Sequence, residues 1–114
     1  MARSIKGSHR IEVRDTEYRW RARGTDCQIS VAIWPRQHDT HAIRCRFGYH
    51  ETRTDAGGAV KLTEQLVVTN RLVRRVLEYA IDRLAYDPAT TSADLLIYGI
   101  EDLIDCSDAV RASK

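Results

Sequence analysis

The strongest constraint on the fold is a period-2 alternation of apolar and polar residues that runs, with three interruptions, from residue 10 to residue 49. Alternation of this period is typical of β-strands that bury one face, because successive side chains point to opposite sides of a sheet. The interruptions are rich in turn-forming residues and lie at Asp15-Thr16, Gly24–Asp26 and Pro35–Thr40. The pattern therefore predicts a four-stranded antiparallel meander with one apolar face and one polar face.

One long helix is predicted after the meander. Thr69 or Asn70 supplies an N-cap, and apolar residues then recur at helical spacing. This apolar stripe consists of Leu72, Val73, Val76, Leu77, Ala80, Ile81 and Leu84. Asp87-Pro88 ends the pattern, because the residue before a proline disfavours the helical conformation.

Shorter segments complete the predicted set of elements. The apolar runs 65–68 and 95–98 are expected to be strands on either side of the helix, and such a pair can form a right-handed crossover. The polar stretch 51–61 is expected to be a mobile loop. Asp105 or Ser107 is expected to cap a last helical turn or two.

These elements predict an α+β fold. Its sheet is mainly antiparallel, a four-stranded meander plus one or two further strands, with one long amphipathic helix packed on the apolar face. The chain has 114 residues, which is enough for one core. Residues 1–114 are therefore expected to form a single domain, with residues 1–8 as a frayed end.

The composition excludes several classes of protein. A net charge of +2 argues against a strongly basic nucleic-acid-binding protein, and 43% hydrophobic residues argue against a disordered acidic chain. No apolar run reaches the roughly 18 residues of a membrane helix, and the first residues lack the apolar core of a signal peptide. We therefore expect a cytoplasmic protein that does not bind membranes. Non-specific nucleic-acid binding remains a third hypothesis, which the small net charge disfavours.

The charge is unevenly distributed along the chain. Residues 1–53 carry eleven basic and six acidic residues, whereas residues 54–114 carry seven and ten. Residues 84–110 contain six acidic residues and no basic one. This asymmetry indicates a contact between oppositely charged surfaces, within one chain or between copies, and we expect a homodimer.

Strand registers follow from pairing inward-facing residues with each other. The first turn then places Glu12 opposite Arg19, and the second places Arg21 opposite Ser30. The third hairpin places Ser30 opposite Arg46. Arginines on the polar face would thus stand on both sides of short residues in the third strand.

Such a trough is suited to carboxylate or phosphate groups, because a guanidinium presents a planar fork of donors. The predicted binding residues are Arg19, Arg21, Arg23, Ser30, Trp34, Arg44 and Arg46. Trp34 would be a natural contact residue if exposed, but it can equally lie under the 35–40 loop. We expect a non-enzymatic binding or interaction module for an anionic ligand or an acidic protein. The alternatives for this face are a merely solvated surface and a contact with a second copy.

A second reading is a small enzyme or small-molecule-binding protein. His50 and Glu51, next to the 51–61 loop, are its weak candidates for acid–base chemistry. His38 and His41 supply only two ligands, so no metal site and no cofactor are expected. Three cysteines without CxxC spacing, Cys27, Cys45 and Cys106, are expected to be buried small hydrophobes.

Several segments together resemble a known kind of protein. They are Tyr18–Arg21 (YRWR), Trp34-Pro35, Phe47–His50 (FGYH), Val68–Arg75 (VTNRLVRR) and Tyr86–Pro88. With them the chain resembles small, uncharacterised bacterial proteins that are carried as accessory genes, including integron cassettes. The resemblance spans residues 10–90. It implies a bacterial, cytoplasmic protein, but no activity and no functional residue.

Overall fold

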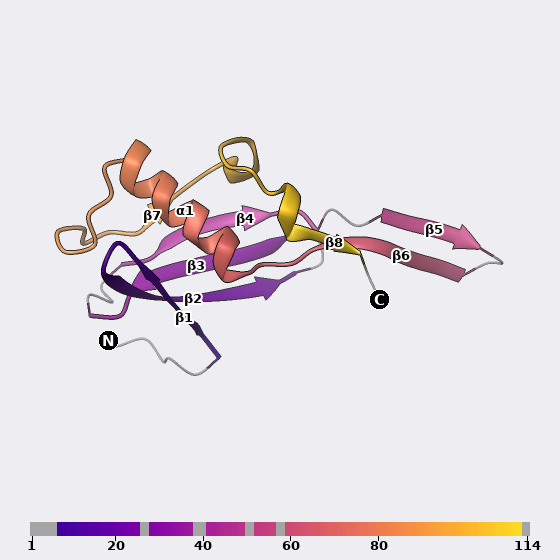
Figure 1. Cartoon of the computed structure of the whole chain (residues 1–114), viewed down its shortest axis with the longest axis horizontal. Coiled ribbons are helices and arrows are strands. Elements are labelled where there is room, and N and C mark those ends of the chain that lie inside the picture. Colours follow the sequence, from indigo (N-terminus) through magenta and orange to yellow (C-terminus); the bar gives the residue numbers. More distant parts are fainter. Residues whose placement is uncertain (1–6, 26–27, 38–40, 50–51, 57–58, 113–114) are drawn as a thin grey trace.

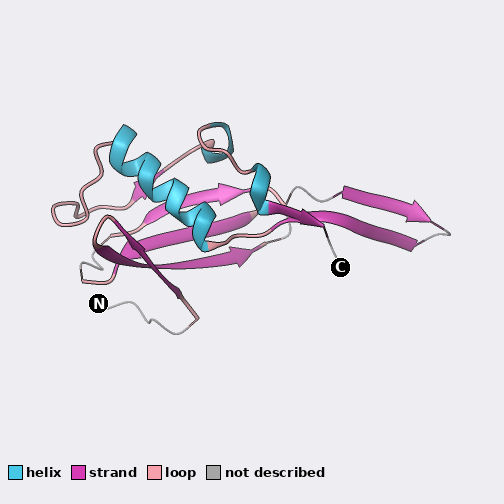
Figure 2. Ribbon diagram, in the orientation of Figure 1, coloured by secondary structure: helices cyan, strands magenta, loops and turns pink. Residues whose placement is uncertain are grey.

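The computed structural model describes residues 7–25, 28–37, 41–49, 52–56 and 59–112. Within these ranges the chain forms two β-sheets, one α-helix and two single-turn 3-10 helices (Figures 1 and 2). The predicted α+β class is therefore confirmed. No helix in the described part of the chain has the length and apolar character needed to cross a membrane.

The first sheet has five strands in the order β1-β2-β3-β4-β7. Their bounds are β1 His9–Val13, β2 Thr16–Gly24, β3 Ile29–Pro35, β4 Ile43–Phe47 and β7 Leu95–Leu96. The first four are antiparallel neighbours, as the alternation predicted, whereas β7 pairs in parallel with β4. The result is a mixed sheet that is mostly antiparallel.

The predicted register of the third hairpin is confirmed, but the first two are wrong by two residues. Ser30 faces Arg46, as expected. Arg19, however, faces Arg10 in β1, and Arg21 faces Ala32 in β3. A shift of two residues leaves each side chain on its predicted face, because the side-chain period of a strand is also two.

The first register differs because the turn lies one residue earlier than predicted. Arg14 and Asp15 both have positive φ, at 50° and 64°. Two central residues with positive φ form the kind of tight hairpin turn that matches the twist of β-strands. Neither residue is a glycine or an asparagine, so the usual sequence signal for this turn is absent.

Helix α1 (Asn70–Arg83) begins where the sequence predicts. The side-chain oxygen of Thr69 accepts a hydrogen bond from the backbone N–H of Leu72 at 3.3 Å. Five residues of the predicted stripe are buried: Leu72, Val73, Val76, Leu77 and Ala80. They belong to one hydrophobic cluster with the inward-facing residues of the first sheet. In the view of Figure 1, α1 overlaps that sheet diagonally.

The end of α1 comes earlier than Asp87-Pro88. Ala85 adopts a left-handed conformation with φ of 54°. The carbonyl of Ala80 accepts hydrogen bonds from the N–H groups of both Leu84 and Tyr86, which closes the last turn. Leu84, predicted to continue the buried stripe, is therefore 41% exposed.

Most of the predicted 51–61 loop belongs to a second sheet, so the loop prediction is wrong for 52–56 and 59–61; residues 51, 57 and 58 lie outside the described residues. Strands β5 (Thr52–Ala56), β6 (Ala59–Leu66) and β8 (Val110–Ala112) pair in the order β5-β6-β8, with antiparallel neighbours. Figure 1 shows β5 and β6 extending past the end of the first sheet, along the 56 Å long axis of the molecule.

This arrangement also corrects the crossover expected between 65–68 and 95–98. The first segment ends β6 in the second sheet, whereas Leu95 and Leu96 pair with β4 in the first sheet. The two segments therefore do not share a sheet. The predicted frayed end, residues 1–8, lies outside the described residues up to residue 6.

The C-terminal segment returns to the junction of the two sheets. After the 3-10 turns η1 (Ile100–Asp102) and η2 (Ser107–Ala109), the carbonyl of Ala109 accepts a hydrogen bond from the N–H of Val67 at 2.8 Å. The predicted last helical turn is present as η2, in 3-10 form, but its N-cap is Cys106 and not Asp105 or Ser107. The Asp105 carboxylate instead accepts a hydrogen bond from the N–H of Ser107 at 3.0 Å.

A close contact fixes the far end of the β2–β3 hairpin. The hydroxyl of Tyr49 donates a hydrogen bond to the carbonyl of Thr25 at 2.5 Å. To reach it, the tyrosine passes over Gly24, where an added Cβ would lie 2.5 Å from the Tyr49 hydroxyl oxygen. The contact requires glycine at position 24.

Candidate functional site

The face of the first sheet that points away from the hydrophobic cluster carries the predicted arginines. In β4, Arg44 and Arg46 are exposed, whereas the residues between and beside them are buried. In β3, Ser30 and Ala32 are partly exposed between buried neighbours. We call this side of the sheet the open face.

The strand registers arrange these residues in two rows across the open face. One row contains Arg23, Ser30 and Arg46, and the next contains Arg21, Ala32 and Arg44. Neighbouring strands are about 4.8 Å apart, so the two arginines of a row stand on strands about 10 Å apart. Each row therefore has long cationic side chains at its ends and a small residue at its centre.

A hollow of about 740 Å³ lies over these rows. Its lining comes from β2, β3, β4 and the segment that begins at β7: Arg21, Arg23, Gln28, Ser30, Val31, Ala32, Arg44, Cys45, Arg46, Phe47, Gly48, Leu96, Ile97, Tyr98, Gly99 and Glu101. Five of the seven predicted binding residues are thus brought together. Ligand sites are commonly concave surfaces of this size.

Two of the four arginines are engaged within the chain. Arg44 donates to the Asp94 carboxylate, with 2.9 Å between Arg44 Nε and Asp94 Oδ2. The other Asp94 oxygen accepts a hydrogen bond from the N–H of Ala42. The Arg21 guanidinium lies 5.9 Å from the ring centroid of Trp34, within the range of a cation–π interaction.

The side chains of the other two arginines have donors without an acceptor among the described residues. Arg46 donates one long hydrogen bond, 3.4 Å, to the side-chain oxygen of Gln28. The Arg23 side chain forms no hydrogen bond or ion pair with any residue in the described ranges. Both side chains are exposed, and they stand on either side of Ser30.

The opposite end of the hollow has a different character. Leu96 and Tyr98 line it and are 52% and 82% exposed. Glu101 also lies there, and its carboxylate accepts a hydrogen bond from the N–H of Gly48 at 3.3 Å. The hollow therefore has a cationic end on β2 and β4 and an apolar end with one carboxylate.

Two predicted binding residues do not line the hollow. Trp34 lies in the row beyond Arg21 but is only 4% exposed, so its ring does not present a contact surface. Arg19 faces Trp34 across the strands, and its side chain is turned toward Glu17, with 3.9 Å between Arg19 Nε and Glu17 Oε2. Neither side chain is therefore available to a ligand in the hollow.

The sequence did not reveal the apolar end of the hollow. Alternation across 95–98 does place Leu96 and Tyr98 on the side opposite to Leu95 and Ile97. That signal says which side chains share a face, but it does not say that the segment pairs with β4. Leu96, Tyr98 and Glu101 were therefore missed as site residues.

The two histidines in the described ranges, His9 and His41, do not line this hollow. His50, Glu51 and His38 lie outside the described residues. His41 is fully buried, with its Nε2 2.5 Å from the hydroxyl oxygen of Tyr86. Among the described residues, no three His, Cys, Asp or Glu side chains lie close enough together to hold a metal ion.

The cysteines with described side chains are also poor nucleophiles. Burial, and secondarily the neighbouring Cys106, raises the pKa of the Cys45 thiol to about 12. Burial also raises the pKa of Cys106. A thiol with a raised pKa is protonated at neutral pH and is not reactive. Cys27 lies outside the described residues.

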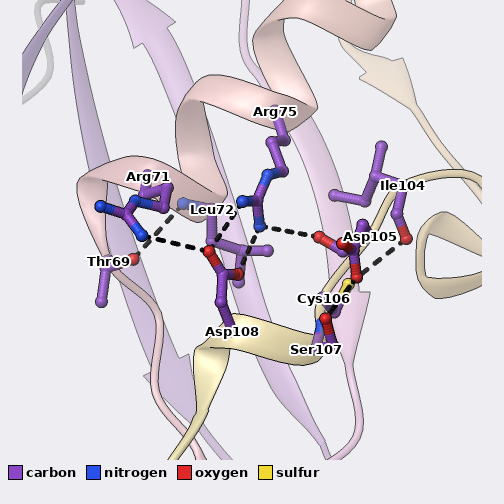
Figure 3. A network of polar contacts seen from close by, with 9 residues as sticks. All are labelled: Thr69, Arg71, Leu72, Arg75, Ile104, Asp105, Cys106, Ser107 and Asp108. Atoms are coloured by element: carbon purple, nitrogen blue, oxygen red, sulfur yellow. Dashed lines mark hydrogen bonds and ion pairs between the residues drawn. The ribbon is translucent and has the colours of Figure 1, made fainter.

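The acidic segment of the sequence forms ion pairs within the chain. Asp94 pairs with Arg44, as described above, and Asp108 lies between Arg71 and Arg75 of α1 (Figure 3). Arg75 also donates to the carbonyl of Asp105 at 2.9 Å. Of the two alternatives left open by the charge asymmetry, these contacts support the one within a single chain; the homodimer stays a prediction.

Comparison of the chain with family models, with curated proteins and with solved structures finds no match. The resemblance to bacterial accessory-gene proteins stays a prediction.

Proposed function

We propose that this protein is a small non-enzymatic binding module whose open face holds an anionic group of a ligand. One observation carries the proposal: Arg23 and Arg46 are exposed in a 740 Å³ hollow, on either side of Ser30, with side-chain donors for which the described residues offer no acceptor. We take α1 to cover the opposite face of the first sheet, so that the open face is turned to solvent.

The chemistry of these three residues favours a carboxylate or a phosphate. Each guanidinium can donate two parallel hydrogen bonds to such a group, and bonds between ionised partners are about twice as strong as neutral ones. The Ser30 hydroxyl, between them, can donate one more hydrogen bond. Because Ser30 is short, the anion can lie between the two arginine side chains and close to the sheet.

The neighbouring arginines contribute less. Asp94 already neutralises Arg44, and the guanidinium of Arg21 lies against the Trp34 ring. An incoming anion would have to displace a carboxylate to use Arg44, whereas Arg23 needs no such exchange. We therefore assign anion binding to Arg23, Ser30 and Arg46.

A titration with inorganic phosphate tests this proposal. At ten times its Kd a ligand that binds only the folded chain stabilises it by about 1.4 kcal/mol, which raises the Tm by about 5 °C for a domain of this size. We expect this shift in the wild type and its loss in the double variant Arg23→Ala, Arg46→Ala.

The matched control is Arg36→Ala, Arg83→Ala. These two arginines are exposed and do not line the hollow, so their replacement removes the same charge elsewhere. The control should bind phosphate as the wild type does. Equal phosphate responses in both double variants, or no response in the wild type, would contradict the proposal.

A further inference from the structure

Exposed hydrophobic side chains form the apolar end of the hollow. The exposed large hydrophobic residues of the described chain are Val67, Leu84, Leu96, Tyr98 and Leu103. Two of them, Leu96 and Tyr98, are next but one in the sequence and line the same hollow. Tyr98 is the most exposed of the set at 82%. Exposed apolar residues that gather in one concave place mark binding surfaces, whereas scattered ones do not.

The backbone holds these two side chains in place. The N–H groups of Leu95 and Ile97 donate to the carbonyls of Ala42 and Arg44, both at 3.0 Å, so Leu96 is anchored on both sides. Gly99 follows Tyr98 with a φ of 67° and turns the chain into η1. The apolar wall is thus fixed to β4 by hydrogen bonds before a ligand arrives, which lowers the entropic cost of binding.

The same register connects the wall to the arginine rows. Leu96 pairs with Arg44, so it continues the row of Arg21, Ala32 and Arg44 on the open face. Tyr98 lies two residues further along the chain in the direction of Arg46, because β4 and β7 run parallel. One ligand in the hollow can therefore contact the Arg23–Arg46 pair and the Tyr98 ring together.

The charges of the hollow restrict the ligand further. The cationic residues of the lining lie on β2 and β4, whereas the part of the lining that begins at Leu96 includes no cationic residue. One anionic group can therefore be held at the cationic end, but a second one would have no cationic partner at the apolar end. An aromatic ring suits the apolar end, because rings stack on tyrosine with a gain beyond the area that they bury.

We infer that the ligand is a small anion with one carboxylate or phosphate group attached to an aromatic ring, with the anionic group between Arg23 and Arg46 and the ring on Tyr98 and Leu96. This inference rests on the proposed function. It adds the chemical class of the ligand and a specificity-determining residue, Tyr98.

The experiment compares probes that differ only in the ring. Phenyl phosphate and inorganic phosphate form one pair, and benzoate and acetate form a second, so that the two pairs distinguish the phosphate and carboxylate chemistries. Titration calorimetry gives the Kd of each probe. In at least one pair we expect the aromatic member to bind wild-type protein about tenfold more tightly, as stacking and burial of one ring would give.

The variant Tyr98→Ala tests where the ring binds. Since Tyr98 is largely exposed, the fold should persist in this variant, and circular dichroism checks that it does. We expect the ring's advantage to fall to about threefold or less, while the Kd of inorganic phosphate stays unchanged. Leu103→Ala, which removes an exposed apolar side chain outside the hollow, should keep the full advantage.

The outcomes separate this inference from the proposed function. If inorganic phosphate binds through Arg23 and Arg46 but phenyl phosphate and benzoate bind no more tightly than their partners, the proposed function holds. The inference that the ligand carries an aromatic ring is then wrong. If the advantage persists in Tyr98→Ala, the ring binds elsewhere and the inference is overturned. If none of the four probes binds the wild type, both fall.

Discussion

Asp108 shows how a single carboxylate connects the end of the chain to the helix. It accepts hydrogen bonds from Arg75 at 2.5 and 2.7 Å and from Arg71 at 3.4 Å (Figure 3). The Arg75 bonds, aided by Arg71, lower the pKa of Asp108 from 3.8 to about 2. A carboxyl group with a lowered pKa in the folded state stabilises the fold above its unfolded pKa, and this contribution is lost as the pH falls through the folded pKa.

The change Asp108→Asn should therefore reduce the acid sensitivity of the protein. Between about pH 5 and pH 2 the wild type loses the Asp108 contribution as the group is protonated, whereas the variant has no such group to protonate. We expect a shallower fall in the free energy of unfolding across this range, measured by urea denaturation at several pH values. Asp102→Asn, at an exposed position in η1, is the control. A variant with the slope of the wild type would show that the ion pair does not form.

At the scale of the elements, local signals were reliable where one residue sets the boundary. Thr69 has the side chain that a helix start needs, and α1 begins there. The predicted C-terminal end of α1 was too late in the sequence, because Ala85 adopts a left-handed conformation that is usual for glycine and rare for alanine. Strand β5 was not predicted because Thr52–Ala56 contains no large apolar residue. Its sequence therefore shows no apolar–polar alternation, although its backbone pairs with β6.

Replacing Thr69 tests the start of α1. Thr69→Ala removes the acceptor for the N–H of Leu72, and loss of an N-cap of this kind costs about 1 kcal/mol. We expect a reduction of this size in the free energy of unfolding from urea denaturation. Thr69→Ser keeps the hydroxyl and should retain most of the stability. If alanine and serine are equivalent, the cap contributes nothing.

At the scale of the whole molecule, the sequence predicted the faces of the strands but not all of their neighbours. The arginine rows depend on hairpins, whose partners are adjacent in the sequence, so Ser30 and Arg46 were paired correctly. The far wall of the hollow depends on β7, which joins β4 across about fifty residues. Nothing local in Leu95 and Leu96 selects that partner, because the pairing joins segments that are far apart in the sequence.

The two sheets should differ in stability. Strands β2 and β3 have partners on both sides and contribute to the hydrophobic cluster, whereas β5 is the edge strand of the second sheet and pairs only with β6. Amide hydrogen exchange measured residue by residue should therefore be slowest in β2 and β3 and faster by orders of magnitude in β5. Equal protection in β5 and β3 would mean that both sheets open only together.

The contact between Gly24 and Tyr49 also bears on how such a sequence can change over time. The phenol occupies the space that any side chain at position 24 would need, so an isolated replacement of the glycine is disfavoured as long as the tyrosine remains. Loss of the tyrosine first would remove the obstacle, at the cost of the hydrogen bond to Thr25. Substitution in this order meets no clash, whereas the reverse order forces the Tyr49 phenol to move. In descendants of this chain, a residue other than glycine at position 24 should be accompanied by a smaller residue at position 49, a directional covariation that sequences gathered later can reveal.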